Sequence, residues 1–150
     1  MSDHHVIYKS EITGYLMFAI ANWLALNSER RQRLSLLADL ERQTRDRYLD
    51  YIARNQLKAS FPVGAALLGV VMGVVSWFLP SQTLWKLLLS GTGPLIQDFK
   101  ALLSDCEQSA VSEADFFRYV VDHEESIEEF ARRALAGRTD ALDPVRELLV

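Results

Sequence analysis

The chain has 150 residues, of which 49% are hydrophobic and 24% are charged, and its net charge is −4. This length and composition exclude a disordered chain and are typical of one folded domain, so we expect residues 1–150 to form a single domain. With 7 Gly and 4 Pro, the chain also has too few turn residues for a β-sandwich or a β-barrel.

Two long amphipathic helices are predicted in the N-terminal part. Apolar residues recur at helical spacing over about 4–26 and again over about 29–56. Ser28 is placed to cap the second helix, and the short connection makes the two helices antiparallel neighbours. The pair His4-His5 is expected to belong to a frayed terminus rather than to a pair of ligands.

The segment that follows is the most apolar part of the chain. No charged residue occurs in 59–85, and 61–79 is almost continuously apolar. This stretch reaches the lower end of the length of a membrane span, and Gly69 and Gly73 have the spacing found where helices touch in lipid. The other interpretation is a central helix that protein packs on most sides. We expect that second arrangement, and membrane association through 61–79 remains the alternative.

The C-terminal half is predicted to be helical as well. Two shorter helices, 81–89 and 94–103, are separated by a turn at Ser90–Gly93. A last long helix covers about 112–135 and is followed by Gly137 as its stop, and a brief helix ends the chain. The predicted fold class is therefore all-α, an antiparallel bundle of four or more long helices.

Four ionisable side chains fall on or beside helical rows that should be apolar. Burying an unpaired carboxylate costs several kcal/mol, so each buried acid needs a partner, a proton or a metal ion. A buried Glu–His hydrogen bond, or a position at the helix edge that reaches water, is the structural alternative. The four residues are Glu11 in the first helix, Glu41 in the second, and His123 and Glu124 in the last.

A Glu on each of the first two helices and a His on the last, all pointing into an antiparallel bundle, resemble the ferritin-like di-iron carboxylate proteins of the rubrerythrin type. The resemblance implies a ferritin-like bundle with iron or manganese as cofactor. It also implies a set of metal ligands, Glu11, Glu41 and His123, with Glu124 as a substitute. The ligand pattern is degenerate, because Thr44 stands where the family has His and Val120 stands where it has Glu.

These features predict a binding or interaction role with a degenerate or absent metal site. One alternative is an iron- or manganese-dependent oxidoreductase that acts on an apolar substrate beside 61–79, and the other is a membrane-associated helical protein. No phosphate-binding loop and no Gly-x-Ser-x-Gly motif occurs in the sequence. No small-molecule ligand can be named from these residues.

Charge and cysteine content bear on partners and compartment. The basic residues of 29–58 are interleaved with acidic ones, so we expect no nucleic-acid partner. Association with further copies of the chain, as a homo-oligomer, is an open alternative. Cys106 is the only cysteine, which excludes an internal disulfide and a Cys-rich zinc site. A single thiol fits a reducing compartment, and we expect a cytoplasmic protein, with membrane association as the alternative.

Overall fold

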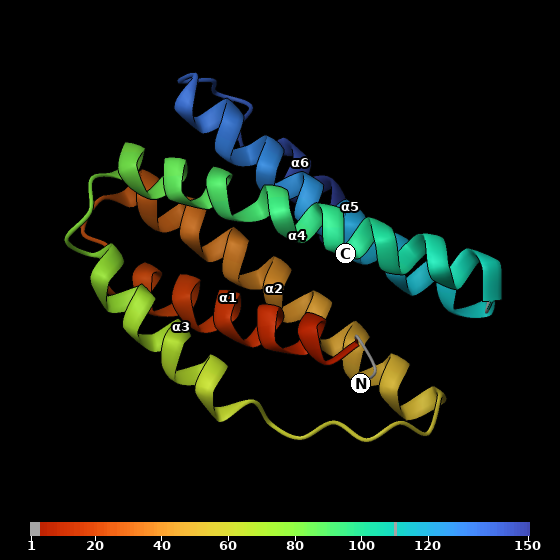
Figure 1. Ribbon diagram of the computed structural model, residues 1–150. Coiled ribbons are helices and arrows are strands. Elements are labelled where there is room, and N and C mark those ends of the chain that lie inside the picture. The colour runs from red at the N-terminus through yellow and green to blue at the C-terminus, as the bar shows by residue number, and fades with distance from the viewer. Residues whose placement is uncertain (1–3, 110) are drawn as a thin grey trace. The chain divides into compact units, whose positions relative to one another are not determined.

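The computed structural model describes residues 4–109 and 111–150, which form helices and short connections with no strand among them (Figure 1). The all-α class predicted from the sequence is therefore confirmed. The chain forms two compact units, Met1–Pro80 and Ser81–Val150. The single domain expected for 1–150 stays a prediction.

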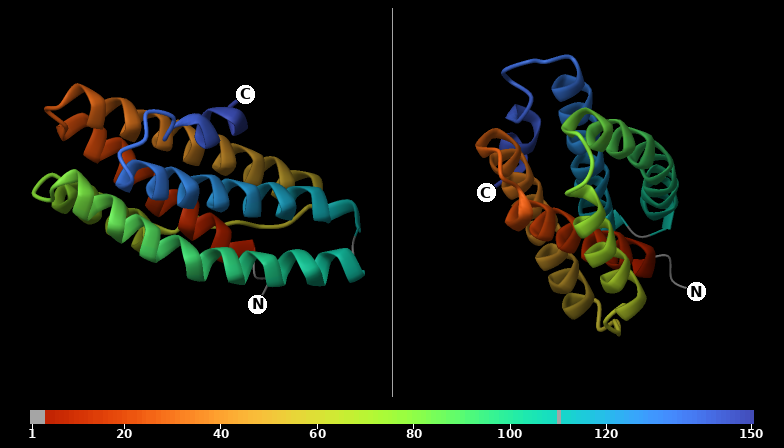
Figure 2. Two further views of the ribbon diagram at one scale, coloured as in Figure 1. Left: turned by 90° about the horizontal axis from the view of Figure 1, so that it is seen from above. Right: turned by 90° about the vertical axis from the view of Figure 1, so that its left-hand side faces the viewer.

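The first unit contains three helices, with the first of them in the middle. They are α1 (His4–Leu24), α2 (Ser28–Arg54) and α3 (Val63–Ser76). Helix α1 packs against both α2 and α3, as the views in Figure 2 also show. Because two faces of α1 are covered, its apolar residues spread around most of the helix, as the wide apolar face in the sequence predicted.

Helices α1 and α2 are antiparallel, as predicted from their short connection. His4 at the start of α1 meets Tyr48 near the end of α2. The N-cap of α2 is Asn27 and not Ser28: the Asn27 Oδ1 accepts a hydrogen bond of 3.0 Å from the Arg30 amide. The cap prediction was off by one residue because both side chains can accept such a bond, and the extended backbone of Asn27 selects it.

Helix α3 runs parallel to α1 and approaches it through glycines. The Thr13 hydroxyl donates a hydrogen bond of 3.1 Å to the Ala65 carbonyl. Four residues later on α3, a Cβ added to Gly69 would lie 2.6 Å from the Thr13 carbonyl oxygen, and one added to Gly73 would lie 2.9 Å from that of Met17. Only residues without a side chain allow backbones to come this close.

The expectation that protein packs the apolar helix on most sides is wrong. Helix α3 covers Val63–Ser76 rather than the whole of 61–79, and its buried residues are Gly69, Gly73 and Ser76. Most of its larger side chains are exposed, Leu67 by 62% and Val71 by 58%. Among the helices of the described residues, none combines the length and the apolar character needed to cross a membrane.

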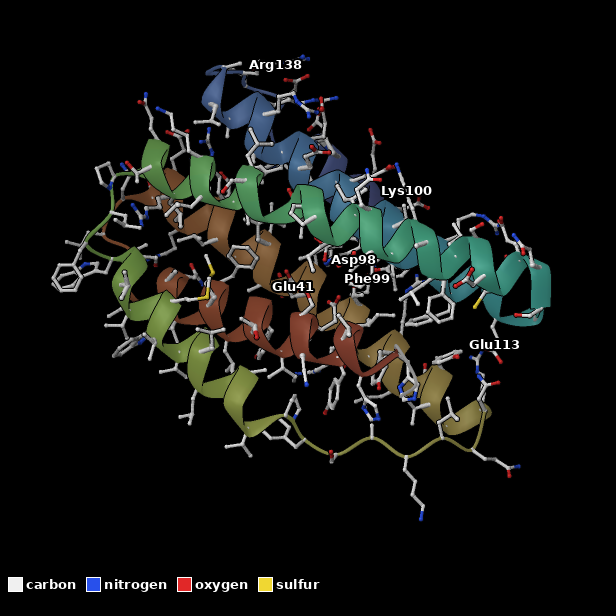
Figure 3. All side chains as sticks on the ribbon, viewed as in Figure 1. Glu41, Asp98, Phe99, Lys100, Glu113 and Arg138 are labelled. Atoms are coloured by element: carbon white, nitrogen blue, oxygen red, sulfur yellow. The ribbon has the colours of Figure 1, made fainter. Side chains whose placement is uncertain are left out.

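The second unit is a hairpin of two long helices with a short third helix. They are α4 (Ser81–Ser109), α5 (Val111–Leu135) and α6 (Asp143–Leu148). Helices α4 and α5 run side by side in Figure 2, and the ring of Trp85 packs edge-on against Phe130 at 5.0 Å. Lys100, labelled in Figure 3, forms an ion pair of 2.6 Å with Glu125 across this hairpin. Gly137 follows α5 with a positive φ of 70°, which confirms it as the stop.

The predicted break at Ser90–Gly93 is wrong, because α4 continues through these residues and through Pro94. A proline inside a helix removes one backbone hydrogen bond. A row of buried residues at helical spacing stabilises α4 as one continuous helix. Its members are Trp85, Thr92, Ile96 and Phe99. Packing of this row outweighs the turn preference of the local sequence.

The glycine contact gives a first prediction. Gly69→Ala and Gly73→Ala should each lower the free energy of unfolding by about 1–3 kcal/mol, because the added methyl group forces the backbones of α1 and α3 apart. Gly64→Ala is the matched control on the same helix: nothing lies within 4 Å of its added Cβ. It should stabilise the protein by about 0.5–1 kcal/mol. Urea denaturation of the three variants measures whether each change lowers or raises the free energy of unfolding. Equal changes at all three glycines would contradict the close contact.

Candidate functional site

Glu41 lies in the contact between α1 and α2. Its side chain is only 5% exposed, and its carboxylate lies against Gly14 of α1 so closely that a Cβ at that position would overlap it. Figure 3 labels Glu41, whose side chain reaches the region of α1. The absence of a side chain at Gly14 therefore creates the space that holds the carboxylate.

Glu11 is a second buried carboxylate of the first unit. It is fully buried on α1 and precedes Gly14 by three residues, so the two positions lie on the same side of the helix about one turn apart. Both predicted carboxylates of the first unit are therefore buried. Carboxylate oxygens can coordinate divalent iron and manganese.

A second buried polar group lies at the start of α1. His4 is 6% exposed, and its Nδ1 is 2.9 Å from the Tyr48 hydroxyl. The Tyr48 ring stacks on Tyr8 at 4.9 Å. Burial, with a smaller contribution from Tyr8, raises the pKa of Tyr48 to about 12, so its hydroxyl keeps its proton at neutral pH. The frayed terminus expected at His4 is wrong, because Tyr48 and Tyr8 hold the first turn of α1 in place.

His123 and Glu124 lie next to each other on α5 in the second unit. Both are buried, with 0% and 3% of their surface exposed. The Ser126 hydroxyl donates a hydrogen bond of 2.7 Å to the His123 carbonyl. The prediction that this row of α5 is buried despite its polar members is thus confirmed.

All four predicted ligand residues are therefore buried, and two belong to each unit. In the first unit Glu11 lies on α1 and Glu41 on α2; in the second, His123 and Glu124 are neighbours in sequence on α5. That the four residues serve a common iron or manganese ion stays a prediction.

The outer face of α3 is a different kind of candidate. We call the exposed apolar residues of 63–78 the α3 face; its larger members are Val63, Leu67, Leu68, Val70, Val71, Met72, Val74, Val75, Trp77 and Phe78. A contiguous exposed apolar surface is rare on a protein without a partner and marks a binding surface. Sequence reasoning found the segment but not the face, because a uniformly apolar helix has no periodicity to show which side packs.

The C-terminal end of α3 is held by a charged side chain from α2. The Arg30 guanidinium donates hydrogen bonds of 2.5 Å to the Ser76 carbonyl and 2.7 Å to the Leu79 carbonyl. Burial lowers the pKa of Arg30, but a guanidinium remains charged at neutral pH. This contact satisfies carbonyl groups that the end of a helix otherwise leaves to water. Sequence reasoning missed Arg30, which looked like one of several surface arginines.

The pairing of Glu41 with Gly14 can be tested by a double-mutant cycle. Gly14→Ala should cost about 1–3 kcal/mol of unfolding free energy, because the added methyl group displaces the Glu41 carboxylate. In a Glu41→Ala background the carboxylate is gone, so the same change should cost at least about 1 kcal/mol less. Thermal or urea unfolding of the four proteins measures the coupling. Additive effects would show that the carboxylate does not occupy the space at Gly14.

The chain matches no protein-family model, no curated protein and no solved structure. Its resemblance to ferritin-like proteins therefore stays a prediction from a few residues.

Proposed function

We propose that this protein is a binding protein that works through the α3 face. The observation that carries the proposal is the exposure of the large apolar side chains of the α3 face, which is 62% at Leu67 and 72% at Phe78. Leaving such side chains in water is unfavourable, and an exposed apolar surface of this kind is typical of sites for protein or membrane partners.

The energetic gain from covering the α3 face supports this role. Full burial of a Val or Leu side chain contributes about 1.5–3 kcal/mol. Side chains such as Val71 and Val75 are about half exposed, 58% and 50%, so covering each one contributes roughly half that amount. Summed over the α3 face, this gain is comparable to the cost of association, about 4–15 kcal/mol. Covering the whole face therefore offsets most of the cost of association.

The binding role predicts adducts at the α3 face in the cells that make the protein. A photoactivatable residue at Val75 should form adducts with a partner, and the same residue at Leu49 should not. Leu49 is the control because it is also apolar and exposed, by 41%, but lies on α2. A second change, Leu67→Asp on the same face, should suppress the adducts at Val75, because binding of a partner would have to remove water from the new charge. Adducts that are equal at both positions, or that survive Leu67→Asp, would contradict the proposal.

Metal binding is a second candidate, and the burial of both predicted carboxylates of the first unit, Glu11 and Glu41, favours it. If it holds, protein purified without chelator contains iron or manganese, and added Fe²⁺ or Mn²⁺ raises the Tm. Glu41→Gln should remove that increase, because a neutral amide is a much poorer ligand than a carboxylate. Elemental analysis and thermal melts of both proteins test this. A wild-type Tm that no metal changes would reject the candidate.

A further inference from the structure

The α3 face is wider than one partner helix covers. Each residue of a helix turns by about 100° around its axis. Opposite the buried Gly69 lies Val71, and the exposed Leu68 and Val70 lie on the two flanks between them. About half of the circumference is therefore apolar and exposed, whereas the seam between two packed helices is a narrower stripe.

The α3 face also lacks polar groups of its own. Ser76 is the only polar side chain of α3, and it is 1% exposed with its hydroxyl bonded at 2.6 Å to the Gly73 carbonyl. No charged residue occurs anywhere in 59–85. A typical protein interface has a polar rim and about one hydrogen bond per 100–200 Å². The hydrocarbon of a lipid bilayer requires neither.

At the end of α3, backbone carbonyl groups accept hydrogen bonds from within the protein, as a lipid environment requires. Without water, every carbonyl needs a partner within the protein, since an unsatisfied one costs several kcal/mol. Arg30 supplies these partners at Ser76 and Leu79, beside the exposed Trp77 and Phe78. In water such a cap is not needed, because solvent satisfies the last carbonyls of a helix.

Exposed aromatic rings gather at this same end of the first unit. Trp77 and Phe78 follow α3 and are 49% and 72% exposed, with their rings 5.0 Å apart. Trp23, which is 80% exposed, continues the row of α1 that faces α3, and the parallel course of the two helices places both ends together. Tryptophan is enriched where a protein meets the boundary between lipid and water.

The length of α3 determines how it can meet a membrane. Its 14 residues extend about 21 Å, which is less than the roughly 30 Å of a hydrocarbon core. A helix of this length can lie in the membrane surface with its apolar half among the acyl chains. The polar side that an isolated surface helix has to provide is supplied here by α1 and α2, which carry most of the charged residues of the first unit.

We propose that the partner of the α3 face is the surface of a lipid bilayer, with α3 lying in the membrane plane. This inference rests on the proposed binding role of α3 and names its partner. The contact is made by acyl chains rather than by charged headgroups, because no charged side chain belongs to the α3 face.

Co-sedimentation of the full chain with phosphatidylcholine vesicles tests the proposal. Wild-type protein should sediment with the vesicles, remain bound at high salt, and show a blue shift of its tryptophan emission. Val71→Glu places a charge at the centre of the α3 face and should lower the partition coefficient at least about tenfold. Leu49→Glu, the same kind of change at an exposed site of α2, should bind as wild type does. Circular dichroism melts check that both variants fold.

Two results would overturn the lipid proposal. If Val71→Glu folds and still binds vesicles as wild type does, the α3 face is not the lipid surface. If wild-type protein ignores the vesicles and light scattering shows a dimer that Val71→Glu converts to monomer, a second copy covers the face. In that second case the proposed binding role stands and only its lipid partner is wrong. If adducts at Val75 are also absent in cells, the binding role itself fails.

Discussion

Gly69 and Gly73 bring the backbone of α3 against that of α1 so closely that a methyl group at either position would overlap an α1 carbonyl oxygen. This contact uses the only small-residue side of α3 that can approach so closely. Because Gly69 and Gly73 face α1 and the buried Ser76 lies at helical spacing from them, the larger side chains have to point the other way. The exposed α3 face is thus a direct consequence of how the helix is packed.

The first unit reverses the usual distribution of residues in two places. Carboxylates are rarely buried and large apolar surfaces are rarely exposed, yet Glu11 and Glu41 are inside and Val71 and Phe78 are outside. Departures from the common pattern reduce stability and are expected where a protein has a function to perform. The Glu41 carboxylate has room because Gly14 has no side chain. Nothing among the described residues of the first unit covers the exposed side chains of the α3 face in a similar way, which is why we assign the binding role to this face.

Much of the fold could be predicted from the sequence, because the segments 4–26, 29–56 and 112–135 have a clear helical period. The limits of the first two helices differ from the structure by only a few residues, and the burial of Glu11, Glu41 and His123 followed from the rows on which they fall. The turn expected before Pro94 was wrong for a physical reason. Local turn preference contributes little against the packing of a buried row such as Trp85 and Phe99 on α4.

The candidate site could be predicted only in part. The segment 61–79 stood out, but its uniform apolar sequence gave no period from which an exposed side could be recognised. The spacing of Gly69 and Gly73 correctly indicated a close helix contact; the partner is α1 of the same unit. The roles of Gly14 and Arg30 depend on residues of another helix, so no pattern along the chain could show them.

The central claim is that the outer face of α3 is open to solvent in the free protein while the side against α1 is closed. Two methionines report on these two sides, since Met72 on α3 is 40% exposed and Met17 on α1 is 8% exposed. Oxidation by hydrogen peroxide, followed by peptide mass spectrometry, compares their rates directly. We predict that Met72 is converted to the sulfoxide at least about tenfold faster than Met17, because oxidation follows exposure. Equal and slow oxidation of both would contradict the account and indicate a helix that protein encloses on all sides.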